Sequence, residues 1–168
     1  SDQVIVLPNN KNIIPAAEQA KHLTKKNIAI VPTKTIPQGI AALLSFNFQS
    51  DLATNLKAME RAANHIKTLE VAIATRSVKL EKIEVKEGNF IGLIDDDLQG
   101  TGADRTALTL EMLERMGTSA ADIITVYYGE SITANKAQAL AEQIRKLYPA
   151  QEVEVVNGGQ PHYHFIIS

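Results

Sequence analysis

The sequence contains no cysteine, which excludes disulfide bridges, thiolate nucleophiles and thiolate metal sites. The lack of cysteine fits a reducing compartment, and we expect a cytoplasmic protein. Long apolar runs are missing as well, because no window approaches the roughly 18 apolar residues of a membrane-spanning helix. We therefore expect no insertion into a membrane.

A large excess of one charge is also missing. The 17 Lys and Arg residues oppose 19 Asp and Glu residues, for a net charge of −2. Proteins that bind nucleic acid through its phosphates carry a basic surface, so we expect no nucleic-acid partner.

Phosphate-binding motifs are missing too. The stretch GTGAD precedes a predicted helix, but neither a third glycine nor Gly-Lys-Ser/Thr follows it, and Asp104 would repel an anion there. We therefore expect no nucleotide site and no cofactor in this chain.

The composition is that of a globular domain, with 45% hydrophobic and 21% charged residues among 168. Residues 3–7 form a short apolar run that Pro and Asn end. Apolar residues in 13–23 then recur at helical spacing, and residues 27–32 form a second run. Strand, helix and strand within about 30 residues predict a βαβ unit with parallel strands.

The rest of the chain mixes helices with alternating strands. Alternation in 70–98 predicts two or three antiparallel strands. Helices are predicted at 52–66, 101–116 and 137–147, and further strands at 122–130, 152–159 and 161–168. We therefore predict an α/β fold with a mixed sheet, which begins with the parallel βαβ unit, continues with antiparallel central strands and ends in a terminal β-hairpin.

No linker rich in Gly, Pro or Ser separates the two halves, so we expect one composite unit over residues 1–168. Two lobes, at about 1–68 and 69–168, are the alternative. The chain begins on a strand-like segment without methionine, and we expect a domain excised from a longer chain.

Polar side chains follow both strands of the predicted βαβ unit. LPNN leaves the first strand and PTKTIPQG the second. Open α/β sheets bind ligands at the carboxyl ends of their strands, so we predict a partner- or ligand-binding site there. A plain connecting loop is the alternative. The predicted residues are Asn9, Asn10, Thr33, Lys34, Thr35 and Gln38.

The last stretch, NGGQPHYHF, offers a second group of candidates. Gly158 and Gly159 allow a positive φ or a close backbone approach, or they simply form a hairpin turn. His162 and His164 would point to one face of a strand, but a metal would need a third ligand that this spacing does not supply. We predict contact residues and no metal: Gly158, Gly159, Gln160 and His162.

Two charged features are weaker candidates. Arg76 interrupts the alternating run EVAIATRS and could hold a carboxylate of an acidic partner, or it could protect an edge strand. Asp95, Asp96 and Asp97 offer oxygen ligands to a hard cation, but a solvated turn is the favoured interpretation.

Five stretches, in order along nearly the whole chain, resemble the carboxyl-terminal domain of the large, dihydroxyacetone-kinase-like subunit of bacterial fatty acid kinase. They are LPNNKNI, VPTKTIPQGIAAL, EGNFIGL, ITVYYGE and NGGQPHYHFIIS. The resemblance implies a fold related to DegV-type proteins. It also implies that ATP and magnesium bind in a separate kinase domain and that this chain has no catalytic residues. PHYHF departs from the expected pattern, which has more tyrosine-like residues.

The resemblance also implies a function. The chain would dock a DegV-type acyl-carrying protein, so that its fatty acid is phosphorylated by the ATP-binding domain. The implied partners are that protein and the chain's own kinase domain, and a homodimer is considered as well. The alternative function is a dihydroxyacetone-kinase-like domain that binds a small carbonyl compound or a lipid, with a histidine holding the carbonyl.

Overall fold

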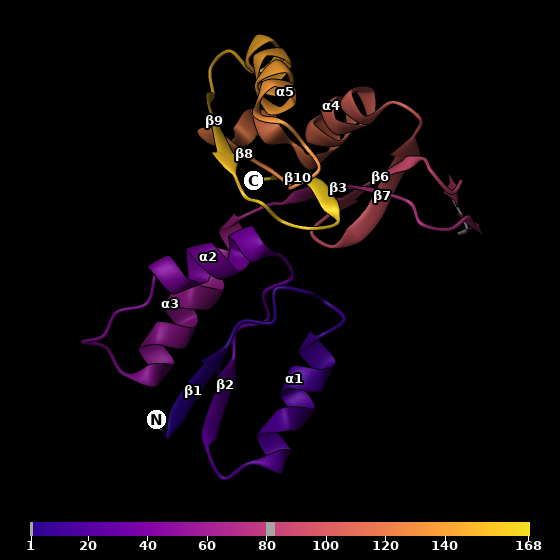
Figure 1. Ribbon diagram of the computed structural model, residues 1–168. Coiled ribbons are helices and arrows are strands. Elements are labelled where there is room, and N and C mark those ends of the chain that lie inside the picture. Colours follow the sequence, from indigo (N-terminus) through magenta and orange to yellow (C-terminus); the bar gives the residue numbers. More distant parts are fainter. Residues whose placement is uncertain (1, 80–82) are drawn as a thin grey trace. The chain divides into compact units, whose positions relative to one another are not determined.

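A computed structural model describes residues 2–79 and 83–168 of the chain. The chain divides into two compact units, Ser1–Lys67 and Thr68–Ser168, and each is described by itself (Figure 1). None of the helices in the described residues is long and apolar enough to cross a membrane.

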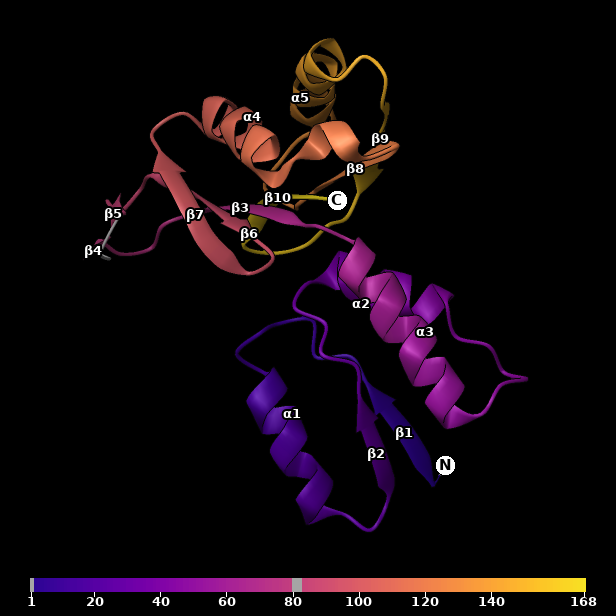
Figure 2. The ribbon, with the colours of Figure 1, turned by 180° about the vertical axis from the view of Figure 1, so that it is seen from behind.

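Unit 1 contains two parallel strands and three α-helices. Its elements are β1 (Gln3–Val6), α1 (Ile14–Ala20), the 3-10 helix η1 (Lys21–Leu23), β2 (Asn27–Ile30), α2 (Ile36–Leu44) and α3 (Leu52–His65). β1 and β2 pair in parallel, from Gln3 opposite Asn27 to Val6 opposite Ile30. The predicted βαβ unit is therefore confirmed. Figures 1 and 2 show α1 on one side of the strand pair and α2 with α3 on the other.

Local sequence explains where two helices of unit 1, α2 and α3, begin. Thr35 precedes α2 and its side chain accepts a hydrogen bond from the Gln38 N–H, while Asp51 does the same for the Thr54 N–H at the start of α3. Both helices bury one face against the strands. The fully enclosed residues of this core are Val31, Ala42, Met59 and Ala63.

Unit 2 is a mixed six-stranded sheet with two helices. Its elements are β3 (Leu69–Ile73), β4 (Val78–Lys79), β5 (Glu84–Val85), β6 (Phe90–Ile94), β7 (Asp97–Gly102), α4 (Arg105–Met116), the 3-10 helix η2 (Thr118–Ala120), β8 (Ile123–Tyr128), α5 (Ala134–Leu147), β9 (Glu152–Asn157) and β10 (Tyr163–Ile167). The strand order is β7-β6-β3-β10-β8-β9, and β4 and β5 form a separate ribbon. Only the pairing of β8 with β9 is parallel within this six-stranded sheet. The predicted α/β class with a mixed sheet is confirmed.

The terminal hairpin is the part of the fold prediction that is wrong. β9 and β10 both pair with β8, on its opposite edges, so they are not neighbours. Burial explains the arrangement: the last three residues of β10 are buried, which suits a central strand, whereas β9 has four exposed residues and one buried residue, which suits an edge strand.

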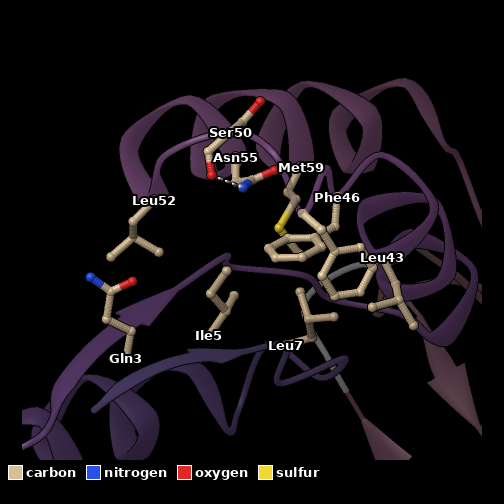
Figure 3. A pocket seen from close by; sticks show the side chains of 10 residues that line it. Gln3, Ile5, Leu7, Leu43, Phe46, Ser50, Leu52, Asn55 and Met59 are labelled. Atoms are coloured by element: carbon tan, nitrogen blue, oxygen red, sulfur yellow. Dashed lines mark hydrogen bonds between the residues drawn. The ribbon is translucent and has the colours of Figure 1, made fainter. Parts of the chain in front are cut away.

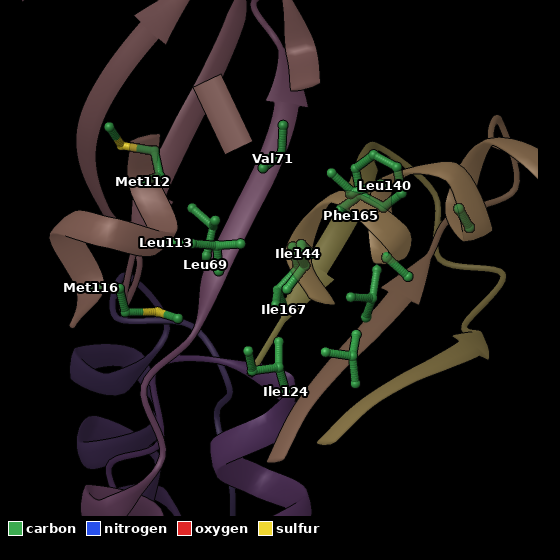
Figure 4. Close-up of a cluster of buried hydrophobic side chains, with 14 of the residues drawn as sticks. Leu69, Val71, Met112, Leu113, Met116, Ile124, Leu140, Ile144, Phe165 and Ile167 are labelled. Atoms are coloured by element: carbon green, nitrogen blue, oxygen red, sulfur yellow. The ribbon is translucent and has the colours of Figure 1, made fainter. Parts of the chain in front are cut away.

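The core of unit 2 lies between the sheet and the helices α4 and α5 (Figure 4). β3 and β10 contribute Leu69, Val71, Phe165 and Ile167, while α4 contributes Met112. Asp104 caps the start of α4 by accepting from the Ala107 N–H, and Gly117 ends the helix with a φ of 78°.

Candidate functional site

Asn9 and Thr33 join the two loops that leave β1 and β2. The Asn9 N–H donates to Thr33 Oγ1 at 3.1 Å, and Thr33 Oγ1 donates to Asn9 Oδ1 at 2.7 Å. Thr33 is fully buried, and Asn9 has a φ of 54°, which Asn tolerates better than most residues. Beside them, Asn10 Oδ1 accepts from the Asn12 N–H at 2.8 Å. The structure therefore brings these predicted site residues together at the carboxyl ends of the parallel strands.

Gln38 fixes the start of α2. Its Oε1 accepts from the Lys34 N–H at 2.9 Å, and its Nε2 donates to the carbonyl of Ile66 at 3.2 Å. Thr35 and Gln38 are buried, whereas the side chain of Lys34 is exposed. Most polar side chains that the sequence offered as ligand donors thus hydrogen-bond inside unit 1, where they set the direction of α2.

One face of α2 presents apolar side chains to solvent. Ile36, Ile40, Leu43 and Leu44 follow the spacing i, i+4, i+7 and i+8, which places them on one side of a helix. Their exposed fractions are 45%, 43%, 62% and 81%, and Phe48 in the following loop is 93% exposed. We call these five residues the α2 apolar surface. Large exposed apolar patches mark interaction sites more often than chance.

Sequence reasoning missed this surface. The signal was the stretch IPQGIAALL, in which every residue except Gln38 is apolar or glycine. A helix formed by such a stretch exposes apolar side chains whichever face it buries.

A pocket of about 510 Å³ lies between β1 and α3, entirely within unit 1 (Figure 3). β1 and the residue after it contribute side chains from one face, and the loop between α2 and α3 contributes two phenylalanines. The lining residues are Gln3, Ile5, Leu7, Leu43, Phe46, Phe48, Ser50, Leu52, Asn55 and Met59.

The loop after β9 folds back onto β8. The N–H groups of Gly158 and Gly159 donate to the carbonyl of Tyr128 at 3.1 and 3.2 Å, and Gln160 Nε2 donates to the carbonyl of Tyr127 at 3.0 Å. Gly159 has a φ of 60°, which glycine adopts without strain. These candidates therefore shape a loop of unit 2 through close backbone contacts.

His162 and His164 do not share a strand face, so that expectation is wrong. β10 begins at Tyr163, and His162 stands before it, exposed and with a φ of 67°. Arg76 is exposed in a bend after β3 rather than inside a strand. Neither the pocket beside β1 nor a second one, of about 370 Å³ beside α4, is lined by a histidine, so nothing in these two pockets favours a histidine that holds a carbonyl compound.

His164 instead contacts Arg105, a residue that sequence reasoning did not single out. Arg105 Nη1 donates to His164 Nδ1 at 3.3 Å, and the guanidinium lies 5.7 Å from the ring centre of Phe90 and 5.5 Å from that of Phe165. Arg105 Nε is buried without a hydrogen-bond partner among the described residues. Burial, followed by the charge of Arg105, lowers the pKa of His164, and burial lowers the pKa of Arg105.

A buried carboxyl group occupies β3. Glu70 is 4% exposed, and its Oε2 has no hydrogen-bond partner among the residues that the structure describes. Burial, and then the charges of Asp96 and Asp95, raise the pKa of Glu70 to about 7. Asp95 and Asp96 form the turn between β6 and β7 with φ values of 51° and 65°, so the predicted turn is present, although Asp96 is buried rather than solvated.

This acidic group does not form a metal site. Within residues 2–79 and 83–168, no three His, Asp or Glu side chains gather in a way that could hold a metal ion.

Some known proteins are similar to this chain in sequence, and others are similar to it in fold. A protein of Staphylococcus aureus (strain USA300) is 35% identical over 166 residues, which is 99% of this chain and 30% of that protein. Protein YloV of Bacillus subtilis (strain 168) is 33% identical over 168 residues, which is all of this chain and 30% of that protein. The chain thus spans less than a third of the length of these relatives.

Solved structures show the same fold at low identity. A DegV family protein from Thermus thermophilus, described by its fatty acid binding, matches with a TM-score of 0.61 at 12% identity, over 99% of this chain and 70% of that one. The fatty acid kinase B3 protein of Streptococcus pneumoniae, loaded with linoleic acid, matches with a TM-score of 0.57 at 10% identity, over 99% of this chain and 71% of that one. The fold is therefore DegV-like.

A family model for the C-terminal domain of FakA-like fatty acid kinase subunits matches residues 1–168. This match confirms the resemblance that the five sequence stretches indicated, and the chain belongs to the family of FakA-like fatty acid kinase C-terminal domains.

Proposed function

We propose that this chain is a docking domain of a fatty acid kinase, which binds a DegV-type acyl-carrying protein and leaves phosphoryl transfer to another domain. In this proposal ATP and magnesium bind in that other domain, and the chain supplies no catalytic residue. Holding two reactants in register can lower a reaction barrier by several kcal/mol without a reacting side chain. Docking alone is therefore a sufficient contribution from this chain.

The α2 apolar surface is the observation that carries the proposal. Helices that bind protein partners commonly use apolar anchors at the spacing i, i+3 or i+4, and i+7, which Ile36, Ile40 and Leu43 follow. Leu44 and Phe48 extend the surface with the largest exposed fractions, 81% and 93%. Partner binding would remove these side chains from water, at roughly 25 cal/mol for each Å² of apolar area.

The loop network supports the same proposal because it fixes α2 before any partner arrives. Thr33 bonds Asn9, and Gln38 bonds both Lys34 and the carbonyl of Ile66. A surface held in one conformation loses less entropy on binding than a mobile one. The buried polar residues of the loop thus contribute to docking indirectly, through the position of α2.

The comparisons support the choice of partner. The family is one of fatty acid kinase domains. One structural neighbour is loaded with linoleic acid, and the other is described by its fatty acid binding. These two neighbours are therefore models for the acyl-carrying partner. In this proposal, the partner and the chain that binds it have the same fold.

Calorimetry with a purified, fatty-acid-loaded DegV-type protein of the same organism tests the proposal. We expect saturable binding with a dissociation constant of about 10 μM or lower. Ile40→Glu and Leu44→Glu should each weaken binding about tenfold or more, because a charge replaces an apolar anchor.

Leu23→Glu is the matched control, since Leu23 is 87% exposed, in unit 1 and outside the α2 apolar surface. It should leave the affinity unchanged. No saturable binding up to about 100 μM, or an equal loss in Leu23→Glu and Leu44→Glu, would refute the proposal.

A further inference from the structure

The pocket between β1 and α3 has the lining of a site for an apolar ligand. Seven of its ten lining residues are apolar: Ile5, Leu7, Leu43, Phe46, Phe48, Leu52 and Met59. Figure 3 shows Ile5 of β1 and Leu7, just after β1, pointing toward the α3 side chains, with Met59 and Phe46 above them. Small-molecule sites are mostly apolar hollows with a few polar groups, as here.

The volume of the pocket indicates whether a small molecule or a single protein side chain would fill it. Its volume of about 510 Å³ lies within the 300–1,000 Å³ that is usual for small-molecule sites. An apolar cavity of about 150 Å³ already holds a benzene molecule. One Leu or Phe side chain from a partner would therefore leave most of this pocket empty, whereas a folded or extended aliphatic chain would fill it.

The polar residues that line the pocket, Gln3, Ser50 and Asn55, carry no charge that could pair with a charged group. Asn55 Nδ2 donates to the carbonyls of Asn47 and Ser50 at 2.9 and 3.2 Å, and Asn55 Oδ1 accepts from the Asn47 N–H at 2.7 Å. No lining residue is charged. Because an unpaired charge is costly near apolar surface, a ligand with an uncharged head fits better than an anion or a cation.

The two ends of the pocket differ in exposure. Met59 is 2% exposed, and its flexible thioether adapts to ligands of different shape. Leu43 and Phe48 are 62% and 93% exposed, and the Phe48 ring meets Phe46 edge to face with centres 4.9 Å apart. A chain that enters past Leu43 and Phe48 would remove both from water.

From these contacts we propose that the pocket binds the aliphatic chain of an uncharged single-chain amphiphile, with the chain against Ile5 and Met59 and the head at the mouth, beside Leu43 and Phe48. This site is separate from the docking function, because it needs the pocket lining and not the whole α2 apolar surface. Leu43 and Phe48 are the residues that both share.

The three methionines make the test specific. Met59 lines the pocket, whereas Met112 and Met116 lie in the core of unit 2. With methyl-labelled methionine, titration with dodecyl maltoside below its micelle concentration should shift the NMR signal of Met59 saturably and leave the other two in place. Dodecanoate, which has a charged head, should bind no more tightly than dodecyl maltoside.

Two adjacent substitutions provide the matched variants. Leu43→Glu puts a charge at the mouth and should weaken binding of dodecyl maltoside at least tenfold. Leu44→Glu is the control, because Leu44 is 81% exposed and does not line the pocket. Leu44→Glu is expected to weaken docking but keep chain binding, so the two proposals can fail separately.

Several results would overturn the assignment. They are no saturable Met59 shift, equal shifts of all three methionines, equal losses in Leu43→Glu and Leu44→Glu, and dodecanoate binding tenfold more tightly than dodecyl maltoside. A Met59 shift caused by the DegV-type protein but not by dodecyl maltoside would assign the pocket to a partner side chain instead.

Discussion

Thr33 and Asn9 hold each other through two hydrogen bonds, although 24 positions separate them in the sequence. Thr33 Oγ1 donates to Asn9 Oδ1 at 2.7 Å and accepts from the Asn9 N–H at 3.1 Å. β1 leads into the loop that contains Asn9, and β2 leads into the loop that contains Thr33. The pair therefore locks the two loops together at the edge of the sheet from which α2 departs.

Thr33→Val should destabilise the protein by about 1–3 kcal/mol, because it keeps the shape of the side chain but leaves both Asn9 groups without their partner. Urea unfolding measures the change. Lys34→Ala is the control, since only the backbone N–H of this exposed residue takes part in the network, and its effect should stay within about 0.5 kcal/mol. Equal effects of the two substitutions would contradict this role for Thr33.

Gly39→Ala should destabilise the wild-type protein, because a Cβ at this position would overlap the Asn9 side-chain amide. Asn9→Ala removes the obstacle. In that background Gly39→Ala should instead stabilise α2 by up to about 1 kcal/mol, as alanine usually does inside a helix. A double-mutant cycle from unfolding curves gives the coupling. The same sign of the Gly39→Ala effect in both backgrounds would show that Asn9 and Gly39 do not interact as described.

Local signals in the sequence account for much of the local structure. Asp51 and Asp104 stand before apolar periodic segments and cap α3 and α4, and Gly117 ends α4 in the left-handed region. The parallel pairing of β1 and β2 followed from the length of the connection. Each of these features depends on residues a few positions apart or on chain length alone.

Pairing between distant segments was harder to predict. β10 follows β9 directly, but its buried residues place it between β3 and β8, and no turn signal encodes that choice. The contact of Arg105 with His164 spans 59 positions. The sequence also does not distinguish polar loop residues that contact a ligand from those, such as Thr33, that hydrogen-bond to each other. The difference depends on burial, which is set by the fold of the whole unit.

Arg105→Leu should raise the pKa of His164. Burial and then the guanidinium charge lower this pKa, and the substitution removes the charge while keeping an apolar side chain beside Phe90. The pKa should remain below its usual value because burial persists. Histidine NMR signals followed against pH measure the change. Arg115→Leu, which removes an exposed charge paired with Glu111, should leave it unaltered, and an unchanged His164 pKa in Arg105→Leu would contradict the contact.

Glu70 should make the protein less stable as the pH rises. Its pKa is about 7 in the folded protein, against an ordinary value of 4.5. Below this ordinary value, Glu70 carries its proton in both the folded and the unfolded state, so its ionisation does not affect folding stability. Between the two values the unfolded chain loses its proton first, so folding stability falls. Above the folded pKa the loss is complete, at about 3–4 kcal/mol.

Glu70→Gln removes this dependence, because the amide has nearly the same shape and no charge. Urea unfolding should show little difference from wild type at about pH 4 and a more stable variant at about pH 8. Asp96→Asn should have a smaller effect in the same direction, since the charge of Asp96 is the second cause of the raised pKa of Glu70, after burial. If the gain from Glu70→Gln is the same at both pH values, folding does not raise the pKa of Glu70, and its buried carboxylate must have a partner that compensates its charge.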